Sequence, residues 1–167
     1  MTTILETEIE TASHPLDLVE DVVSANEWPF DRPADDELLA EVTGRFCDLR
    51  LFFVWREDFN AIHFTCAFDA RVPPHHRREI HELLGMVNEK LWLGHFELAS
   101  DDGAPMFRHT LPLRGVPGPA IEQIEDMLET ALSECDRFFP AFQFVNWGGK
   151  NAEEAFKAAM FETMGEA

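Results

Sequence analysis

The chain has 167 residues, of which 46% are hydrophobic, and a formal net charge of −19 at pH 7. This length and apolar content suit one domain with its own hydrophobic core. The charge disfavours nucleic acid and anionic membranes as partners, because both require clustered Lys and Arg. We therefore expect no nucleic-acid or membrane binding.

The acidity is unevenly distributed along the chain. Residues 1–41 contain twelve acidic residues and one basic residue, and residues 117–167 contain ten and three. Residues 42–116 are nearly neutral, with ten acidic and nine basic residues. The excess negative charge therefore belongs to the outer, mainly helical segments, where it favours solubility.

The N-terminal segment and the cysteines indicate a cytoplasmic protein. Residues 1–12 are rich in Thr and Glu and predict a flexible acidic tail, without the apolar stretch of a signal peptide. No apolar run reaches membrane-spanning length. Cys47, Cys66 and Cys135 lack CxxC spacing, and an odd number of cysteines cannot pair fully within one chain. We expect all three thiols to be reduced.

Residues 13–167 predict a single domain that opens with a helix. Ser13 can cap this helix, and Pro15 suits its first turn. Trp28-Pro29-Phe30 ends it, because a residue before proline is pushed out of the helical region. Its stripe at helical spacing consists of Leu16, Val19, Val22, Val23 and Asn26.

Residues 37–71 predict three antiparallel strands with one shared apolar face. Apolar and polar residues alternate with the two-residue period of a half-buried strand. A four-residue connection at 57–60 would set Leu51 opposite Cys66 and Phe53 opposite Phe64, so that both apolar rows lie together. The apolar rows are Leu49, Leu51, Phe53 and Trp55, then Ile62, Phe64, Cys66 and Phe68. Phe52 and Val54 interrupt the polar row, which indicates an outer face that is partly covered too.

The rest of the chain predicts a helix, a hairpin and two further helices. The stripe of the first of these helices is Ile80, Leu83, Leu84, Val87 and Leu91. The hairpin joins residues 93–99 to 105–114, and Pro112 indicates that its second strand lies at a sheet edge. A third helix begins near Ala120, and Asn151 with Glu154 resembles the capping box of a fourth. The order α-βββ-α-ββ-α-α is an α+β fold, in which helices cover an antiparallel sheet made of a three-strand meander plus a hairpin.

Motifs that suggest catalysis or metal binding fail on spacing. His76 and His81 are five residues apart, not the four that place two ligands on one helical face. Gly148-Gly149-Lys150 lacks the first glycine and the hydroxyl residue of a phosphate-binding loop. No cysteine stands in a basic setting that would lower its pKa. We expect no catalytic residue, no cofactor and no metal.

Two regions are candidates for binding. Five aromatic side chains crowd into residues 138–147: Phe138, Phe139, Phe142, Phe144 and Trp147. No single helical face can bury them all, so this segment is either sandwiched inside the domain or partly a surface for another chain. The second candidate is a polar pocket at the hairpin, lined by His95, Arg108 and His109, for which ordinary cross-strand contacts are the competing interpretation.

Three stretches of the sequence resemble the YbjN-domain family, in its alphaproteobacterial branch. They are residues 91–98 (LWLGHFEL), 107–115 (FRHTLPLRG) and 140–150 (PAFQFVNWGGK). The resemblance extends over about residues 16–163, and members of the family are described as sensory transduction regulators. It implies a fold like that of the type III secretion chaperones, which are small, acidic, often dimeric proteins that bind partner polypeptides. It implies no catalytic residues.

Together these features predict a non-enzymatic protein-binding module, a regulator or chaperone-like adaptor that forms a homodimer and binds an unknown protein partner. The alternative is a small-molecule sensor, or an unrecognised enzyme, that uses the pocket near the second hairpin. A deep enclosed cavity there would favour the alternative, whereas a broad apolar surface would favour the binding module.

Overall fold

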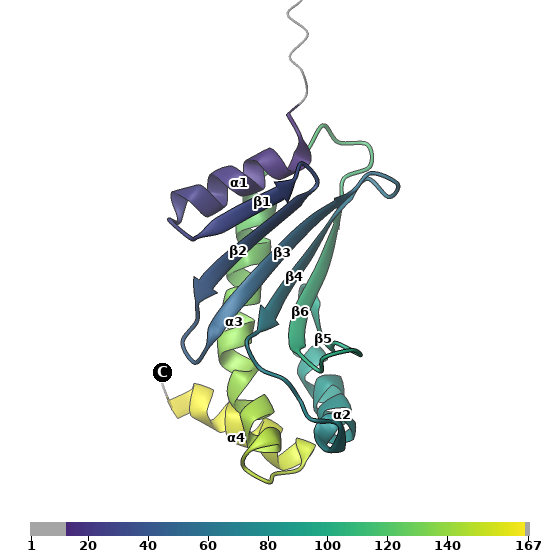
Figure 1. The fold of residues 1–167 in the computed structure, drawn as a ribbon. Coiled ribbons are helices and arrows are strands. Elements are labelled where there is room, and N and C mark those ends of the chain that lie inside the picture. The colour runs from purple at the N-terminus through teal and green to yellow at the C-terminus, as the bar shows by residue number, and fades with distance from the viewer. Residues whose placement is uncertain (1–12, 166–167) are drawn as a thin grey trace, which may run out of the picture.

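The computed structural model describes residues 13–165, so the predicted tail at 1–12 lies outside the described residues. Six strands form one antiparallel sheet in the order β1-β2-β3-β4-β6-β5 (Figure 1). The strands are β1 Phe30–Ala34, β2 Glu37–Thr43, β3 Asp48–Arg56, β4 Ala61–Phe68, β5 His95–Leu98 and β6 Pro105–Pro112. The helices are α1 Pro15–Ala25, α2 Arg77–Asn88 after a 3₁₀ turn at Pro74–His76, α3 Ile121–Asn146 and α4 Ala152–Gly165. The predicted α+β fold class is confirmed.

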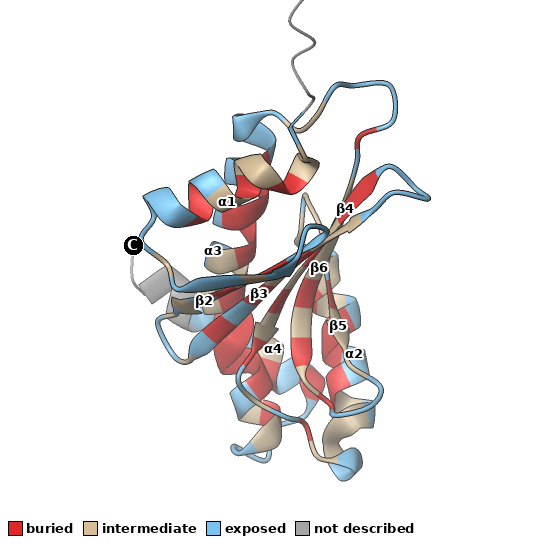
Figure 2. Cartoon of the chain, turned by 45° about the horizontal axis from the view of Figure 1, so that its top comes forward, coloured by how far each residue is buried: buried red, intermediate tan, exposed pale blue. Residues whose placement is uncertain are grey.

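The helices cover one face of the sheet. In Figure 1, α3 runs behind the strands and α1 lies across its N-terminal end. Helices α2 and α4 pack against each other and against α3 at the far end of the domain. Buried residues lie where the sheet meets these helices (Figure 2). No helix among residues 13–165 covers the other face, which is the one towards the viewer in Figure 1.

The register of the meander is the predicted one. Leu51 pairs with Cys66 and Phe53 with Phe64, and the chain turns through residues 57–60. The rings of Phe53 and Phe64 stack with their centroids 4.8 Å apart. Both apolar rows therefore face the helices, as the two-residue period requires.

The structure adds a strand, β1, that the sequence pattern did not indicate, so four strands precede α2 rather than three. β1 pairs with β2 through Phe30 opposite Ala40, and its register shifts after Asp31. None of its residues is buried, and Pro33 lies within it. An edge strand has one neighbour and needs no alternating apolar row, which is why periodicity missed it.

Strand β6 is not an edge strand, which corrects the expectation drawn from Pro112. It lies between β4 and β5, but β5 pairs only with residues 105–108. The N–H of Leu113 donates to the Asn60 carbonyl on the β4 side. Because neighbouring residues of a strand point their backbone groups to opposite sides, the nitrogen of Pro112 points to the side that β5 leaves unpaired. The proline therefore costs the sheet no hydrogen bond.

Helix α1 begins at a different cap from the predicted one and is fastened to β1. Pro15 is the first helical residue, so the cap is His14 and not Ser13; the Leu16 N–H donates to Nδ1 of His14 over 3.1 Å. Arg32 of β1 donates from Nη1 to Asp17 over 2.8 Å and to Glu20 over 2.7 Å. This guanidinium holds the edge strand and the helix together.

Helix α3 continues through Pro140 and ends at Asn146. The Gly148 N–H donates back to the Gln143 carbonyl over 3.3 Å at this end. The next helix, α4, is capped by Asn151, whose Oδ1 accepts from the Glu154 N–H over 2.9 Å. The Glu154 carboxylate accepts in turn from the Asn151 side-chain amide over 3.1 Å.

The contact between Arg32 and α1 predicts a measurable loss on substitution. Arg32→Met should lower the free energy of unfolding by about 1 kcal/mol at neutral pH, since two charge-assisted hydrogen bonds are lost. The hydrogen bond from Arg32 lowers the pKa of Asp17 despite some burial. The stabilisation is therefore present at neutral pH and fades as the pH falls below about 4, where the carboxylate takes up a proton.

Urea unfolding of the two proteins at pH 7 and at about pH 3 measures this difference, which should shrink in acid. Arg56→Met is the matched control, because Arg56 and its partner Asp58 form an exposed pair within one turn. An equal loss in both variants would contradict a specific role of Arg32.

Candidate functional site

The uncovered face of the sheet is the broadest candidate surface. Cross-strand pairing places its outward side chains in rows, because paired residues point to the same side. One row is Leu39, Phe52, Thr65, Arg108 and His95. The next is Glu41, Arg50, Ala67, Met106 and Glu97. We call these ten residues, with the neighbouring pair Val54 and His63, the open face.

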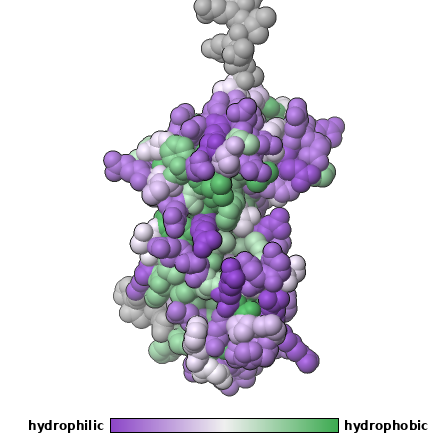
Figure 3. Space-filling view, in the orientation of Figure 1, coloured by the Kyte–Doolittle hydropathy of each residue, from purple (hydrophilic) through white to green (hydrophobic). Residues whose placement is uncertain are grey.

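The centre of the open face is apolar. Leu39, Phe52, Val54 and Met106 are each half-buried, although no helix among the described residues lies over them. Apolar side chains gather over these strands in Figure 3, with hydrophilic side chains around them. An apolar surface of this kind on an acidic protein is typical of an interaction site.

Charged groups at the edge of the open face neutralise one another. Glu97 accepts from Arg108 over 3.0 Å and lies 2.6 Å from Nε2 of His95. Burial raises the pKa of Glu97, but the hydrogen bonds from His95 and Arg108 outweigh it and hold the pKa below its usual value. Arg50 Nη2 lies 2.9 Å from Asp69. The face is thus locally balanced in charge, unlike the chain as a whole.

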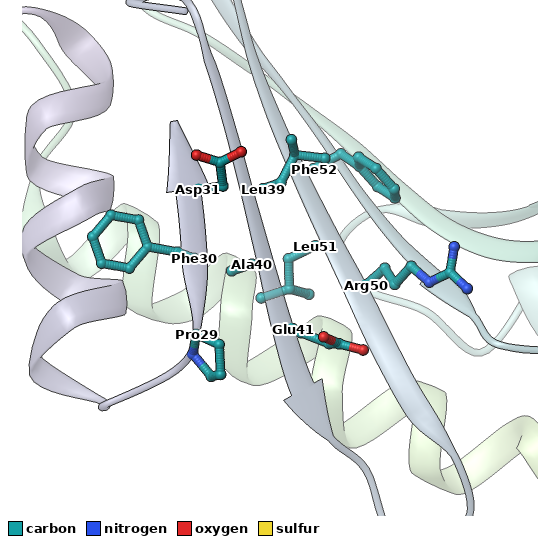
Figure 4. Close-up of a pocket in the computed structure, with 9 residues that line it drawn as sticks. All are labelled: Pro29, Phe30, Asp31, Leu39, Ala40, Glu41, Arg50, Leu51 and Phe52. Atoms are coloured by element: carbon teal, nitrogen blue, oxygen red, sulfur yellow. The ribbon is translucent and has the colours of Figure 1, made fainter. Parts of the chain in front are cut away.

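Two shallow hollows lie on or beside this face. One, of about 400 Å³, is lined by β1, β2 and β3 (Figure 4). In that view Glu41, Arg50 and Phe52 project away from α1, whereas the ring of Phe30 lies towards it. The other, of about 560 Å³, reaches from Phe52 to the turn of the second hairpin at Asp101. Both are open to solvent rather than enclosed.

The predicted polar pocket does not form. His95 and Arg108 are cross-strand partners on the open face. His109 is paired with Phe64, so it points to the opposite, helix-covered face. Burial, together with His95, lowers the pKa of His109. The residue that joins His95 and Arg108 is Glu97, which the sequence reasoning missed although it alternates with His95 along the same strand.

The aromatic segment at 138–147 divides between core and surface. Phe138, Phe139 and Phe142 are 0%, 6% and 2% exposed, so they belong to the core and offer no surface to a partner. Phe144 is half-buried, with the Lys150 ammonium 5.8 Å from its ring centroid. Trp147 is 85% exposed at the end of α3. The sandwiched interpretation therefore holds for the first three rings.

The thiols are free, and two of them meet in the core. Cys66 of β4 and Cys135 of α3 have their sulfur atoms 3.7 Å apart. Burial raises the pKa of Cys135 and of Cys47, which keeps both protonated at neutral pH.

In the described part of the chain, no three His, Cys, Asp or Glu side chains gather as metal ligands would. None of the helices described here is long and apolar enough to span a membrane.

Comparisons with known proteins point to one family. The YbjN family model, whose description is "Putative bacterial sensory transduction regulator", matches residues 15–144. The fold is similar to the crystal structure of "YbjN, a putative transcription regulator from E. coli", with a TM-score of 0.52 and 14% identity. That match covers 72% of this chain and 85% of the other, and at this identity it establishes the fold alone. A comparison with curated proteins gives no match.

The division of the aromatic segment predicts effects of very different size for two substitutions. Phe142→Ala should lower the free energy of unfolding by about 3–5 kcal/mol, because it leaves a cavity among the rings of Phe68 and Phe96. Trp147→Ala should change it by less than about 0.5 kcal/mol, because the indole packs on little. Chemical denaturation measures both. A large loss in the Trp147 variant would place that side chain in the packed structure.

Proposed function

Because this chain belongs to the YbjN family, we propose that it is a non-enzymatic protein-binding module, a regulator or chaperone-like adaptor that works as a cytoplasmic homodimer. The description of the family as a sensory transduction regulator supports a regulatory role. The observation that carries the proposal is the open face, whose apolar centre has no covering layer in the described part of the chain. Burial against another protein would remove this surface from water.

Charge supports a second copy of the chain as the occupant of the open face. Each chain carries a net charge of −19, so two copies repel each other over most of their surfaces. The open face is the broad apolar surface on which arginines offset the carboxylates: Arg108 pairs with Glu97, and Arg50 with Asp69. A two-fold axis through this face would bring the Phe52 rings of both copies together at its centre.

The hollows weigh against the alternative of a small-molecule sensor. Ligand sites usually enclose most of the ligand surface and place a few polar groups around it. Here the hollows of about 400 and 560 Å³ are open to solvent. The polar residues expected to line a pocket lie on opposite faces of the sheet, since His109 points away from His95. A broad surface suits a protein partner better than a small ligand.

The dimer is tested by placing a charge at the centre of the open face. The wild type should elute from size exclusion with a mass, measured by light scattering, of about twice the 19.1 kDa of one chain. Phe52→Asp should weaken association by more than about a hundredfold, because burying an unpaired carboxylate costs several kcal/mol. Met106→Asp, two strands away on the same face, should act in the same way.

Trp92→Asp provides the control, because Trp92 is 72% exposed and lies outside the open face. The circular dichroism spectrum should remain unchanged in any variant that dissociates, and that variant should still unfold cooperatively. A wild type of 19.1 kDa at every concentration would refute the dimer. Dissociation by Trp92→Asp alone would place the interface elsewhere.

A further inference from the structure

A second apolar surface lies among the helices rather than on the sheet. Helix α1, the turn after it and the first half of α3 border a hollow of about 620 Å³, which we call the helical groove. Its apolar floor is formed by Leu18, Val22, Trp28, Ile121, Leu128 and Leu132. These side chains lie on the side of the sheet opposite the open face, so the two surfaces are separate.

The floor of the helical groove is elongated. On α3 the floor residues recur at 121, 128 and 132, along one stripe of the helix. At a rise of 1.5 Å per residue, this stripe is about 16 Å long, or about three helical turns. Ile121 is 45% exposed and Trp28 is half-buried, so the floor is accessible from solvent.

The rim of the groove carries negative charge only. Asp21 of α1 and Glu125 and Glu129 of α3 line it. Helix α1 and residues 121–136 contain no Lys or Arg, although 121–136 contain six acidic residues. Among the described residues, Arg32 reaches α1, but it pairs with Asp17 and Glu20 and not with the rim. None of the three rim carboxylates takes part in an ion pair within residues 13–161.

We propose that the helical groove binds a basic amphipathic helix of a partner protein. The apolar stripe of that helix would pack on Leu18, Trp28 and Ile121, and its Lys and Arg side chains would pair with Asp21, Glu125 and Glu129. A short amphipathic helix matches both the length of the floor and the sign of the rim. The inference rests on the proposed protein-binding function and specifies one class of partner for it. That partner would bind the helical groove and not the open face.

Charge excludes two other occupants of the groove. A second copy would bring a further net charge of −19 to a rim that holds only carboxylates. An anionic membrane would be repelled for the same reason. The negative potential of the rim would speed the association of a cationic partner. It would also favour that partner over neutral or acidic proteins.

The test uses a fluorescent synthetic peptide of Leu and Lys, about four turns long, with the apolar residues on one helical face. Fluorescence anisotropy with the full chain should show saturable binding with a Kd in the micromolar range, weakened at least about tenfold when the salt is raised to about 0.5 M. A peptide of the same composition with a scrambled order, and one with Glu in place of Lys, should bind much more weakly. Equal binding of the scrambled peptide would overturn the proposal, because it would show charge attraction without a groove.

Three variants locate the binding. The double variant Glu125→Lys with Glu129→Lys should weaken the Kd at least about tenfold. Glu82→Lys with Glu89→Lys makes the same change in net charge at exposed positions of α2 and its cap, and should change the Kd by less than about twofold. Ile121→Ser should weaken binding severalfold without changing the melting temperature, since Ile121 is 45% exposed. Equal loss in both double variants would also overturn the proposal.

The two proposals fail in different ways. The monomeric Phe52→Asp variant should bind the peptide as the wild type does, because Phe52 lies on the open face and not in the groove. A wild type that is monomeric but binds the peptide would refute the dimer alone. A wild type that is dimeric but binds no basic amphipathic peptide would refute the groove alone.

Discussion

The packing of helices α1 and α3 against strands β3 and β4 is the interaction on which the rest of the structure depends. The inward rows of these strands place Phe53, Phe64 and Cys66 in contact with the helix layer, and all three are almost fully buried. Helix α3 extends over 26 residues and supplies Phe138 and Phe142 to the same core. Because this helix and its neighbours occupy one side of the sheet, the described chain leaves the other side without a layer. The open face is a direct consequence.

Charge then assigns different roles to the two accessible apolar surfaces. Most of the open face belongs to the nearly neutral middle of the chain, where Arg50 and Arg108 are matched by carboxylates. The helical groove belongs to the acidic outer segments, whose rim residues include Glu125 and Glu129 without a counter-ion on the same helices. A surface of balanced charge suits a copy of a strongly acidic chain, whereas an acidic rim suits a cation. The two proposed occupants follow from this difference alone.

The sequence predicts the parts of the fold that obey a short-range rule. The two-residue period and a four-residue turn are enough to set Phe53 opposite Phe64, because a slip by one residue would turn an entire apolar row to solvent. The two-residue period does not predict strand β1, because β1 is held by one neighbouring strand and by Arg32. This arginine pairs with Asp17 and Glu20 of α1, which lie 15 and 12 residues earlier in the chain.

The candidate sites also divide into features that a short-range pattern predicts and features that depend on contacts between distant segments. Consecutive residues of a strand point to opposite faces of the sheet, so Arg108 and His109 cannot line one pocket. The sequence alone is enough to predict this, because the two residues are adjacent in one strand. The helical groove could not be predicted in this way, because it exists only where α1 crosses α3. The burial of Phe138 and exposure of Trp147 likewise depend on where α3 ends.

The two ends of the sheet limit how large an assembly of this protein can become. On one side β1 is short, irregular in register and contains Pro33; on the other, β5 has only four residues and Pro112 of β6 faces the unpaired stretch. Proline and short edge strands prevent a further strand from being added by backbone hydrogen bonding. Growth of the sheet into a continuous fibril is therefore blocked at both edges. A chain that associates through one two-fold face then closes as a dimer, which suits a protein whose exposed apolar surfaces would otherwise favour aggregation.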